Sequence, residues 1–320
     1  MARLDLRNQM GGLLQAFARD GFLILPAFFD DAAITRVQSA IERVKLARPN
    51  DVVIDNLENG ERTVLGLMTP AQIAHDRMKI NDLYLGTAEI REMALAADLV
   101  PVLWALLGQV PALCNSLYLE KGSAQEPHVD ALYMTPRTER HLIASWVALE
   151  DSHADAGPLE YFPGSHLLPQ MRFADGSLRA RDAEMPAWRD YIQARIAEAG
   201  LEKRAFSARK GDVFIWHAHL LHGGGEIRDY ARTRKSCVFH YYSEPDARLA
   251  GRNLVPLAGA YWLDRAPQPL PPEVARRLPF SEAAYLKRYP DVAAAIATGH
   301  IPSARAHYET YGQREGRLPC

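Results

Sequence analysis

The sequence has few of the features that mark several common classes of protein. Its 320 residues include only three cysteines, Cys114, Cys237 and Cys320, which are far apart and odd in number. This pattern argues against a disulfide framework and against a cysteine zinc site, and it is typical of a reduced, cytoplasmic protein. No apolar run approaches the ~20 residues that cross a bilayer. The first residues, MARLDLRNQMGG, contain no apolar core of a secretory signal, so we expect none.

An excess of charge of one sign is also missing. The formal net charge is −2, and no run of lysine and arginine occurs. A surface for nucleic acid is therefore not expected. The length allows one large core, or a core plus a small appendage.

The first third of the chain has mixed periodicity. Apolar residues at helical spacing predict helices, and short apolar runs that end at glycine or proline predict strands. We expect a helix over 8–20, a strand over 22–26, a helix capped by Asp30 or Asp31, a hairpin over 52–68 around Asn59-Gly60, and a helix over 88–108.

From about residue 114 the pattern becomes one of short β-type runs separated by glycine, proline and aspartate. The runs are CNSLYLEK, HLIASWVALE, GPLEYFPG, DVFIWHAHLL and KSCVFHYY, with one insertion over roughly 167–205 that contains a charged helical piece. Many short strands with turn signals predict a barrel or a sandwich.

The chain divides into three parts by composition. We expect a main domain over 1–266, a proline-rich linker over 267–278, and a small helical module over 279–320. At ~40 residues the module is marginal as an independent fold, so we expect it to dock on another surface.

Two segments carry residues that suit a metal ion. In the extended segment EPHVD, side chains two apart point to the same side, so His128 and Asp130 can face one point. A second segment, WHAHLLHGGG, follows an apolar strand and offers His217, His219 and His222 as further imidazoles. Two histidines and one carboxylate occupy one face of an octahedral ion and leave open positions, as in non-haem Fe(II) oxygenases.

Shortly after these histidines the sequence carries a basic segment, RTRKS. If the flanking strands pair antiparallel, the loop returns Arg234 to the metal, with Arg232 as the alternative. A guanidinium fork matches the distal carboxylate of a 2-oxo diacid, and Ser236 faces the same side.

The chain resembles the phytanoyl-CoA dioxygenase (PhyH) family of Fe(II)- and 2-oxoglutarate-dependent oxygenases. The segments that carry the resemblance occur in family order over about 15–245 and are RDGFLILPAFFDD, EKGSAQEPHVDALY, SWVALEDSHADAGPLEYFPGSH, KGDVFIWHAHLLHGGG and RKSCVFHYY. The resemblance implies an α+β protein with a double-stranded β-helix, or cupin-type jelly roll, and flanking helices. It also implies that the protein uses Fe(II), 2-oxoglutarate and O2.

The resemblance also implies roles for single residues. The family's iron ligands correspond to His128, Asp130 and His222, and its 2-oxoglutarate arginine corresponds to Arg234. Further cosubstrate contacts would come from residues that match less specifically, namely Trp146, Tyr118 and Ser236. Halogenating relatives replace the carboxylate of the triad, so the presence of Asp130 argues against halogenation.

The expected activity is hydroxylation of an unactivated C–H bond in a small-molecule, lipid-like or glycan-related substrate. Desaturation, ring closure and epimerisation at the same metal stay open. The alternative is a catalytically idle jelly-roll module that serves binding or assembly in a bacterial glycan pathway.

The last segment resembles a short repeat found beside bacterial glycosyltransferases. Residues Tyr285, Pro290-Asp291-Val292, His307-Tyr308 and the run from Tyr311 to Arg317 carry this likeness. It implies a bacterial source and a protein or glycan partner for 279–320, and a helical pad covering the barrel is the other interpretation.

Overall fold

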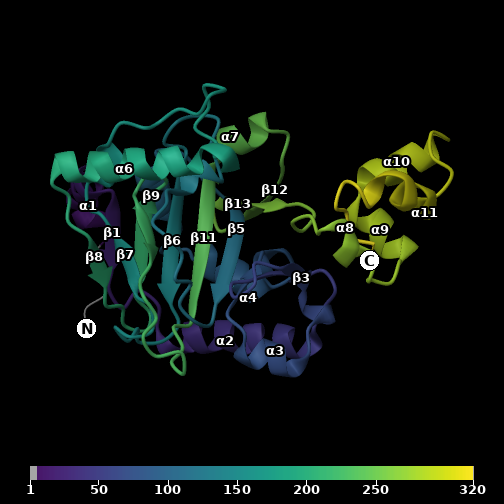
Figure 1. Ribbon diagram of the computed structural model, residues 1–320, viewed down its shortest axis with the longest axis horizontal. Coiled ribbons are helices and arrows are strands. Elements are labelled where there is room, and N and C mark those ends of the chain that lie inside the picture. Colours follow the sequence, from purple (N-terminus) through teal and green to yellow (C-terminus); the bar gives the residue numbers. More distant parts are fainter. Residues whose placement is uncertain (1–5, 320) are drawn as a thin grey trace.

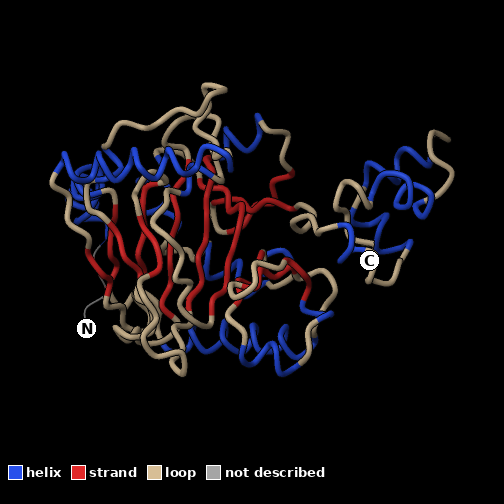
Figure 2. Tube along the Cα trace, viewed as in Figure 1, coloured by secondary structure: helices blue, strands red, loops and turns tan. Residues whose placement is uncertain are grey.

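The computed structural model describes residues 6–319 of the chain, and two β-sheets form its centre. Figure 1 shows the elements in order, and Figure 2 shows the strands gathered in one body. The larger sheet has the order β1-β9-β6-β11-β5-β4-β2-β3, with β13 also paired to β5 and to β12. Its strands are β1 (Phe22–Leu25), β2 (Val53–Asn56), β3 (Arg62–Val64), β4 (Met78–Asn81), β5 (Pro111–Leu119), β6 (Leu142–Ala148), β9 (Val213–His217), β11 (Ser236–Ser243), β12 (Asn253–Leu257) and β13 (Ala260–Asp264).

A smaller sheet packs against the larger one. It has the order β10-β7-β8, with strands β7 (Leu159–Tyr161), β8 (Arg204–Phe206) and β10 (His222–Gly224). Side chains of both sheets interdigitate between them, among them Trp146, Phe206, Phe214 and Trp216. Two facing sheets around a filled interior are the jelly roll that the family resemblance implies.

Helices cover the outer face of the larger sheet. They include α1 (Leu6–Asp20), α2 (Asp31–Ala47), α4 (Ala88–Ala94) and α5 (Val100–Leu107), whose apolar residues share one core cluster with the strands. The Asp30 carboxylate accepts a hydrogen bond from the Ala33 amide and so begins α2, as expected. Alternation along β11 sends Phe239 and Tyr241 into this outer core and leaves Val238 and His240 facing inward.

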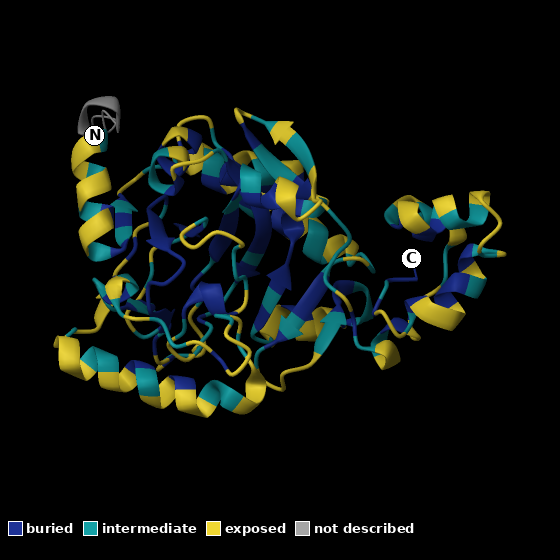
Figure 3. Ribbon diagram, turned by 90° about the horizontal axis from the view of Figure 1, so that it is seen from above, coloured by how far each residue is buried: buried dark blue, intermediate teal, exposed yellow. Residues whose placement is uncertain are grey.

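Three further helices lie at the edges of the main body. They are α3 (Pro70–His75), α6 (Met185–Ala199) and α7 (Glu244–Leu249), and α6 is the helix expected within the 167–205 insertion. Figure 3 shows that buried residues concentrate in the sheets while the peripheral helices present exposed outer faces. None of the helices between residues 6 and 319 is long and apolar enough to cross a bilayer.

The single helix expected over 88–108 is wrong, because the chain breaks between α4 and α5. Leu95 ends α4, and Leu99 begins α5 with Pro101 in its first turn. A proline lacks the N–H that would bond to the preceding turn, and its ring clashes with that turn's carbonyl group. Pro101 is therefore tolerated at a helix start and excludes a continuous helix.

The cysteines agree with the absence of a disulfide framework. Cys114 and Cys237 are free and buried, and Cys320 lies outside the described residues.

The segment expected to be a linker is in part a docking element. Within 267–278 the structure has α8 (Pro272–Ala275), and Leu270 and Leu278 are buried with Val53 and Val64 of the early hairpin. Four proline rings favour extended backbone and turns, but apolar residues between them still find a hydrophobic surface to cover.

Beyond it lie α9 (Glu282–Arg288), α10 (Pro290–Ala297), α11 (Ala304–His307) and a π-helical turn (Tyr308–Gly312). They enclose a small aromatic core, which includes Tyr285, Tyr289 and Tyr308, and they project from the barrel beyond β12 and β13 (Figure 1). Arg288 pairs with Asp51 at 2.9 Å and ties this module to the main body.

Truncation of Leu278 tests this docking. Leu278→Ala removes buried apolar volume and should destabilise the docked arrangement by about 2–4 kcal/mol. Limited proteolysis should then cut near residues 266–280 at much lower protease concentration than in the unmodified chain. Leu46→Ala is the control, since Leu46 is 82% exposed and its truncation should change neither melting nor cleavage. Equal resistance of both variants would contradict a docked segment.

Candidate metal and cosubstrate site

Backbone pairing brings the metal-binding residues together. The His128 amide donates to the His222 carbonyl at 2.9 Å, and the His222 amide donates to the His128 carbonyl at 3.0 Å. His222 opens β10, and Asp130 opens a short 3₁₀ turn directly after the paired segment. The two histidines are therefore direct cross-strand neighbours, with Asp130 two residues further on.

Three ligand atoms then converge. Oδ1 of Asp130 lies 3.9 Å from Nε2 of His128 and 3.7 Å from Nε2 of His222. One donor atom from each of these three residues lies within 4.8 Å of the others, and they are the one group of this kind that residues 6–319 contain. A set of two imidazoles and one carboxylate is the facial triad of non-haem iron sites.

The imidazoles are held in the tautomer that binding requires. Nδ1 of His128 lies 2.9 Å from the Glu126 carbonyl, and Nδ1 of His222 lies 3.0 Å from the Leu220 carbonyl. Since a carbonyl only accepts, each Nδ1 carries the proton and each Nε2 offers a lone pair. Burial, and then the neighbouring His222, lower the pKa of the His128 imidazole to about 3, which keeps it neutral.

The carboxylate is oriented by two groups behind it. Nε1 of Trp216 donates to Oδ2 of Asp130 at 2.7 Å, and Nε2 of His240 lies 3.5 Å from the same oxygen. Burial alone would raise the pKa of Asp130, but His222, His240 and His128 outweigh it and hold that pKa well below its ordinary value. Asp130 is thus an anion whose Oδ1 faces the two imidazoles.

A cavity beside the triad contains a buried arginine. Arg234 is 4% exposed, its guanidinium donates to the Gly157 carbonyl at 2.7 Å, and its carbon Cζ lies 5.7 Å from the centre of the Trp146 ring. Nε of Arg234 and the hydroxyl of Ser236 have no hydrogen-bond partner within the described chain. Burial lowers the pKa of Arg234 to about 10, so at neutral pH it is a charge that needs a counter-ion.

A second cation lines the same cavity. Lys79 on β4 donates to Oε1 of Gln125 at 2.9 Å, and no carboxylate of the described residues lies within ion-pair distance of it. Burial lowers the pKa of Lys79. The sequence analysis missed this lysine, although its place between Met78 and Ile80 in a short alternating run was a signal that it faces one side of a strand.

The glycines after His222 serve close packing. A Cβ atom at Gly223 would lie 2.7 Å from the Gln125 carbonyl oxygen, and one at Gly224 would lie 2.4 Å from the Ser123 hydroxyl. The run therefore lets β10 approach the segment before His128, and both glycines line the cavity.

Tyr118 was expected among the cosubstrate contacts, and that prediction is wrong. Leu117 and Leu119 of β5 face the cavity, whereas Tyr118 packs in the outer core against the helices. Neighbouring side chains of a strand point to opposite faces, so a displacement of one residue reverses the direction. Trp146 and Arg234 do line the cavity, and Ser236 is buried at the start of β11, on the same face of the strand as Val238 and His240.

The alternative residues His217, His219 and Arg232 do not line the cavity beside the triad. His217 and His219 stack near His166, with ring centres 5.4 Å apart for His217 and His166 and 5.5 Å for His217 and His219. Arg232 is exposed and pairs with Asp229 at 3.0 Å. Tertiary structure thus favours His222 as the third ligand and Arg234 as the buried cation.

The chain is similar in sequence to two nematode proteins. Two nematode proteins named "Phytanoyl-CoA dioxygenase domain-containing protein 1 homolog" align with 283 residues each. The one from Caenorhabditis briggsae is 24% identical and the one from Caenorhabditis elegans is 20% identical, and both alignments cover 76% of this chain and 94% of the relative. The alignments therefore include nearly the whole of each relative and leave part of this chain unmatched.

Solved structures are similar in fold. The non-heme alpha ketoglutarate dependent carbocyclase SnoK has a TM-score of 0.58 at 17% identity, covering 82% of this chain and 96% of its own. The epimerase SnoN has a TM-score of 0.56 at 21% identity, covering 81% and 99%. EctD from S. alaskensis with bound Fe has a TM-score of 0.54 at 17% identity, covering 77% and 79%.

The profile of one family, Phytanoyl-CoA dioxygenase (PhyH), matches residues 17–235. That range contains the triad, the buried arginine and most strands of both sheets. Because the match spans more than half of the chain, the chain belongs to the phytanoyl-CoA dioxygenase family of Fe(II)- and 2-oxoglutarate-dependent oxygenases.

Proposed function

We propose that the protein binds Fe(II) through His128, Asp130 and His222, binds 2-oxoglutarate with Arg234, and hydroxylates an unactivated C–H bond of a small-molecule substrate. The observation that carries this proposal is the convergence of three ligand atoms beside a buried guanidinium without a counter-ion. The substrate would be lipid-like or glycan-related.

The residues of the site fit these groups. Two neutral imidazoles and an anionic carboxylate suit a divalent iron ion and leave positions for a cosubstrate. Arg234 and Lys79 line one cavity, and two cations in one buried site suit a dicarboxylate such as 2-oxoglutarate. The unpartnered Ser236 hydroxyl can add a hydrogen bond to the same carboxylate as Arg234.

The chemistry divides between the bound groups and the protein. Bound Fe(II), 2-oxoglutarate and O2 supply the oxidising power for C–H cleavage. The chain holds the ligands in one tautomer, compensates the charge of the cosubstrate, and surrounds it with Leu117, Leu119, Trp146 and Val238, which exclude water.

Two measurements distinguish this proposal from its alternatives, namely the metal content and the identity of the product. An idle binding module need not bind Fe(II), so metal content after anaerobic reconstitution discriminates it from an enzyme. The similar solved structures include a carbocyclase and an epimerase, so product analysis must distinguish hydroxylation from ring closure or epimerisation. A protein or glycan partner for residues 279–320, and the bacterial source, stay predictions.

Removal of a ligand is the first test. His128→Ala and Asp130→Ala should each abolish iron-dependent formation of succinate from 2-oxoglutarate, because each leaves two ligands for the ion. His153→Ala, at an exposed histidine, is the control and should keep full turnover. Retention of turnover in both ligand variants would remove the proposal.

The buried guanidinium is the second test. Arg234→Lys should raise the KM for 2-oxoglutarate about tenfold or more, since one charge-assisted hydrogen bond is worth about 1.5–3 kcal/mol. Arg232→Lys changes an exposed arginine that pairs with Asp229 and should leave KM unchanged. A reversed result would assign the cosubstrate to Arg232.

The indole behind the carboxylate is the third test. Trp216→Phe keeps the ring packing but removes the donor to Oδ2 of Asp130. Partners of this kind typically contribute 10–100-fold to metal affinity, so the Kd for Fe(II) should rise by about that factor at unchanged Tm. Trp188→Phe on α6, also buried, is the matched control and should leave the Kd as it is. An equal Kd in both variants would show that the indole does not orient the carboxylate.

A further inference from the structure

A second cavity also reaches the triad, and Arg234 is not among its lining residues. It has a volume of about 810 Å³ and is lined by His128, Asp130 and His240 at its metal end. Residues 265–269, which we call the C-terminal arm, form part of its wall. This arm lies beyond the residues 17–235 that match the family, so family membership assigns it no role.

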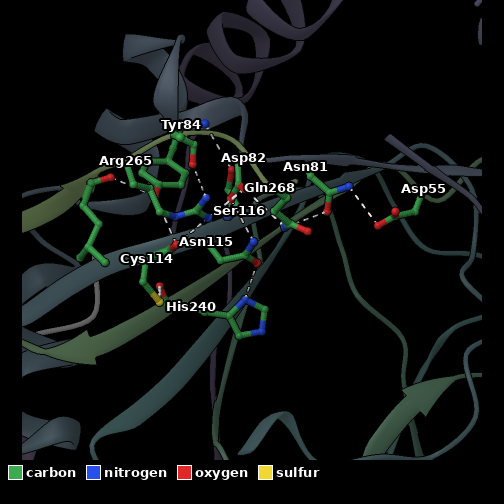
Figure 4. A network of polar contacts seen from close by, with 12 residues as sticks. Asp55, Asn81, Asp82, Tyr84, Cys114, Asn115, Ser116, His240, Arg265 and Gln268 are labelled. Atoms are coloured by element: carbon green, nitrogen blue, oxygen red, sulfur yellow. Dashed lines mark hydrogen bonds and ion pairs between the residues drawn. The ribbon is translucent and has the colours of Figure 1, made fainter. Parts of the chain in front are cut away.

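The arm is fixed to the barrel by one buried carboxylate. A guanidinium nitrogen of Arg265 donates to Oδ2 of Asp82 at 2.8 Å and to the Cys114 carbonyl at 3.1 Å, and Gln268 donates to the same Oδ2 at 3.3 Å. The guanidinium also lies over the Tyr84 ring, with Cζ 5.9 Å from its centre. Figure 4 shows the arm residues gathered around Asp82.

Asp82 is held in a conformation that costs free energy. It is 5% exposed and has a φ of 56°, in the left-handed region that residues other than glycine seldom adopt. Such strain persists where surrounding contacts hold it, and it is concentrated at functional sites. Here the contacts come from the arm on one side and from β5 on the other.

The second oxygen of Asp82 orients an amide on β5. Nδ2 of Asn115 donates to Oδ1 of Asp82 at 3.0 Å. Because a carboxylate only accepts, this bond settles which end of the Asn115 amide points where. Its oxygen Oδ1 must face the other way, toward Nδ1 of His240 at 3.0 Å.

His240 transmits this orientation to the triad. An amide oxygen accepts, so Nδ1 of His240 carries a proton and donates it to Asn115. Nε2 is then the ring atom directed at the metal site, 3.5 Å from Oδ2 of Asp130. Trp216 donates a hydrogen bond to that oxygen, and the His240 ring lies against it, so the position of the ring limits how far the Asp130 carboxylate can rotate.

We propose that Arg265 is a positioning residue for the metal site, acting through Asp82, Asn115 and His240 on the carboxylate of Asp130. The inference rests on the proposed function, since it concerns the same triad. It means that the C-terminal arm completes the site and is more than a connection to the helical module. The wall of the second cavity and the metal ligand Asp130 are thereby connected by one continuous series of contacts.

Two variants interrupt the line at different points. Arg265→Met removes the arm's cation, and Asp82→Asn keeps the shape but replaces one acceptor by a donor, so that Arg265 and Asn115 cannot both be satisfied. Each should weaken Fe(II) binding by about fivefold or more in anaerobic titration, somewhat less than loss of a direct partner of a ligand. Arg265→Lys restores the charge and should recover part of the affinity.

A second measurement, made on the metal-free protein, accompanies the iron titration. In the metal-free protein, NMR of ¹⁵N-labelled histidine should show a protonated Nδ1 for His240, assigned by its loss in His240→Asn. Arg265→Met and Asp82→Asn should shift or broaden that signal, and Arg265→Lys should return it toward its original position. A residue that only supports the fold would lower Tm without changing this signal.

The matched control is Arg288→Met. Arg288 also ties the C-terminal module to the barrel, through Asp51, but has no contact with the line of residues described. It should change neither iron affinity nor the His240 signal. Suppose that the unmodified protein binds iron normally, and that Arg265→Met and Asp82→Asn change neither the iron affinity nor the His240 signal. That result overturns the role of Arg265 and leaves the proposed function standing. Failure of the unmodified protein to bind iron overturns the proposed function as well.

Discussion

The pair of backbone hydrogen bonds between His128 and His222 is the constraint on which the site depends. These bonds join two segments that are far apart in the sequence and make the two imidazoles neighbours across a short ladder. Glycines are needed beside the ladder because no side chain would fit between the segments. Asp130 completes the triad because it follows His128 by two residues.

Burial decides the charge states at the site. It keeps His128 neutral, whereas the surrounding imidazoles keep Asp130 anionic against the cost of burial. The same burial lowers the pKa of Arg234 and of Lys79, and Nε of Arg234 has no hydrogen-bond partner among the residues that the structure describes. A site that already compensates an anion's charge binds that anion without reorganising, which is the physical basis of cosubstrate selection.

The C-terminal arm and the helical module lie outside residues 17–235, the range that matches the family. The C-terminal arm and the helical module follow the barrel, and the arm shares the Asp82 carboxylate with β5. Residues of both sheets line the cavity beside the triad, and residues 265–269 line part of the second cavity.

The sequence alone determined the spacing of His128 and Asp130 and the strand pattern of the barrel, because alternation and local motifs depend on near neighbours. For the buried cation it favoured Arg234 and left Arg232 as the alternative. It could not decide among His217, His219 and His222, nor the direction of Tyr118, because one step along a strand reverses the face that a side chain occupies. The series of contacts from Arg265 to Asp130 could not be predicted from the sequence either. Its contacts join residues from separate elements, and only tertiary packing sets which of them meet.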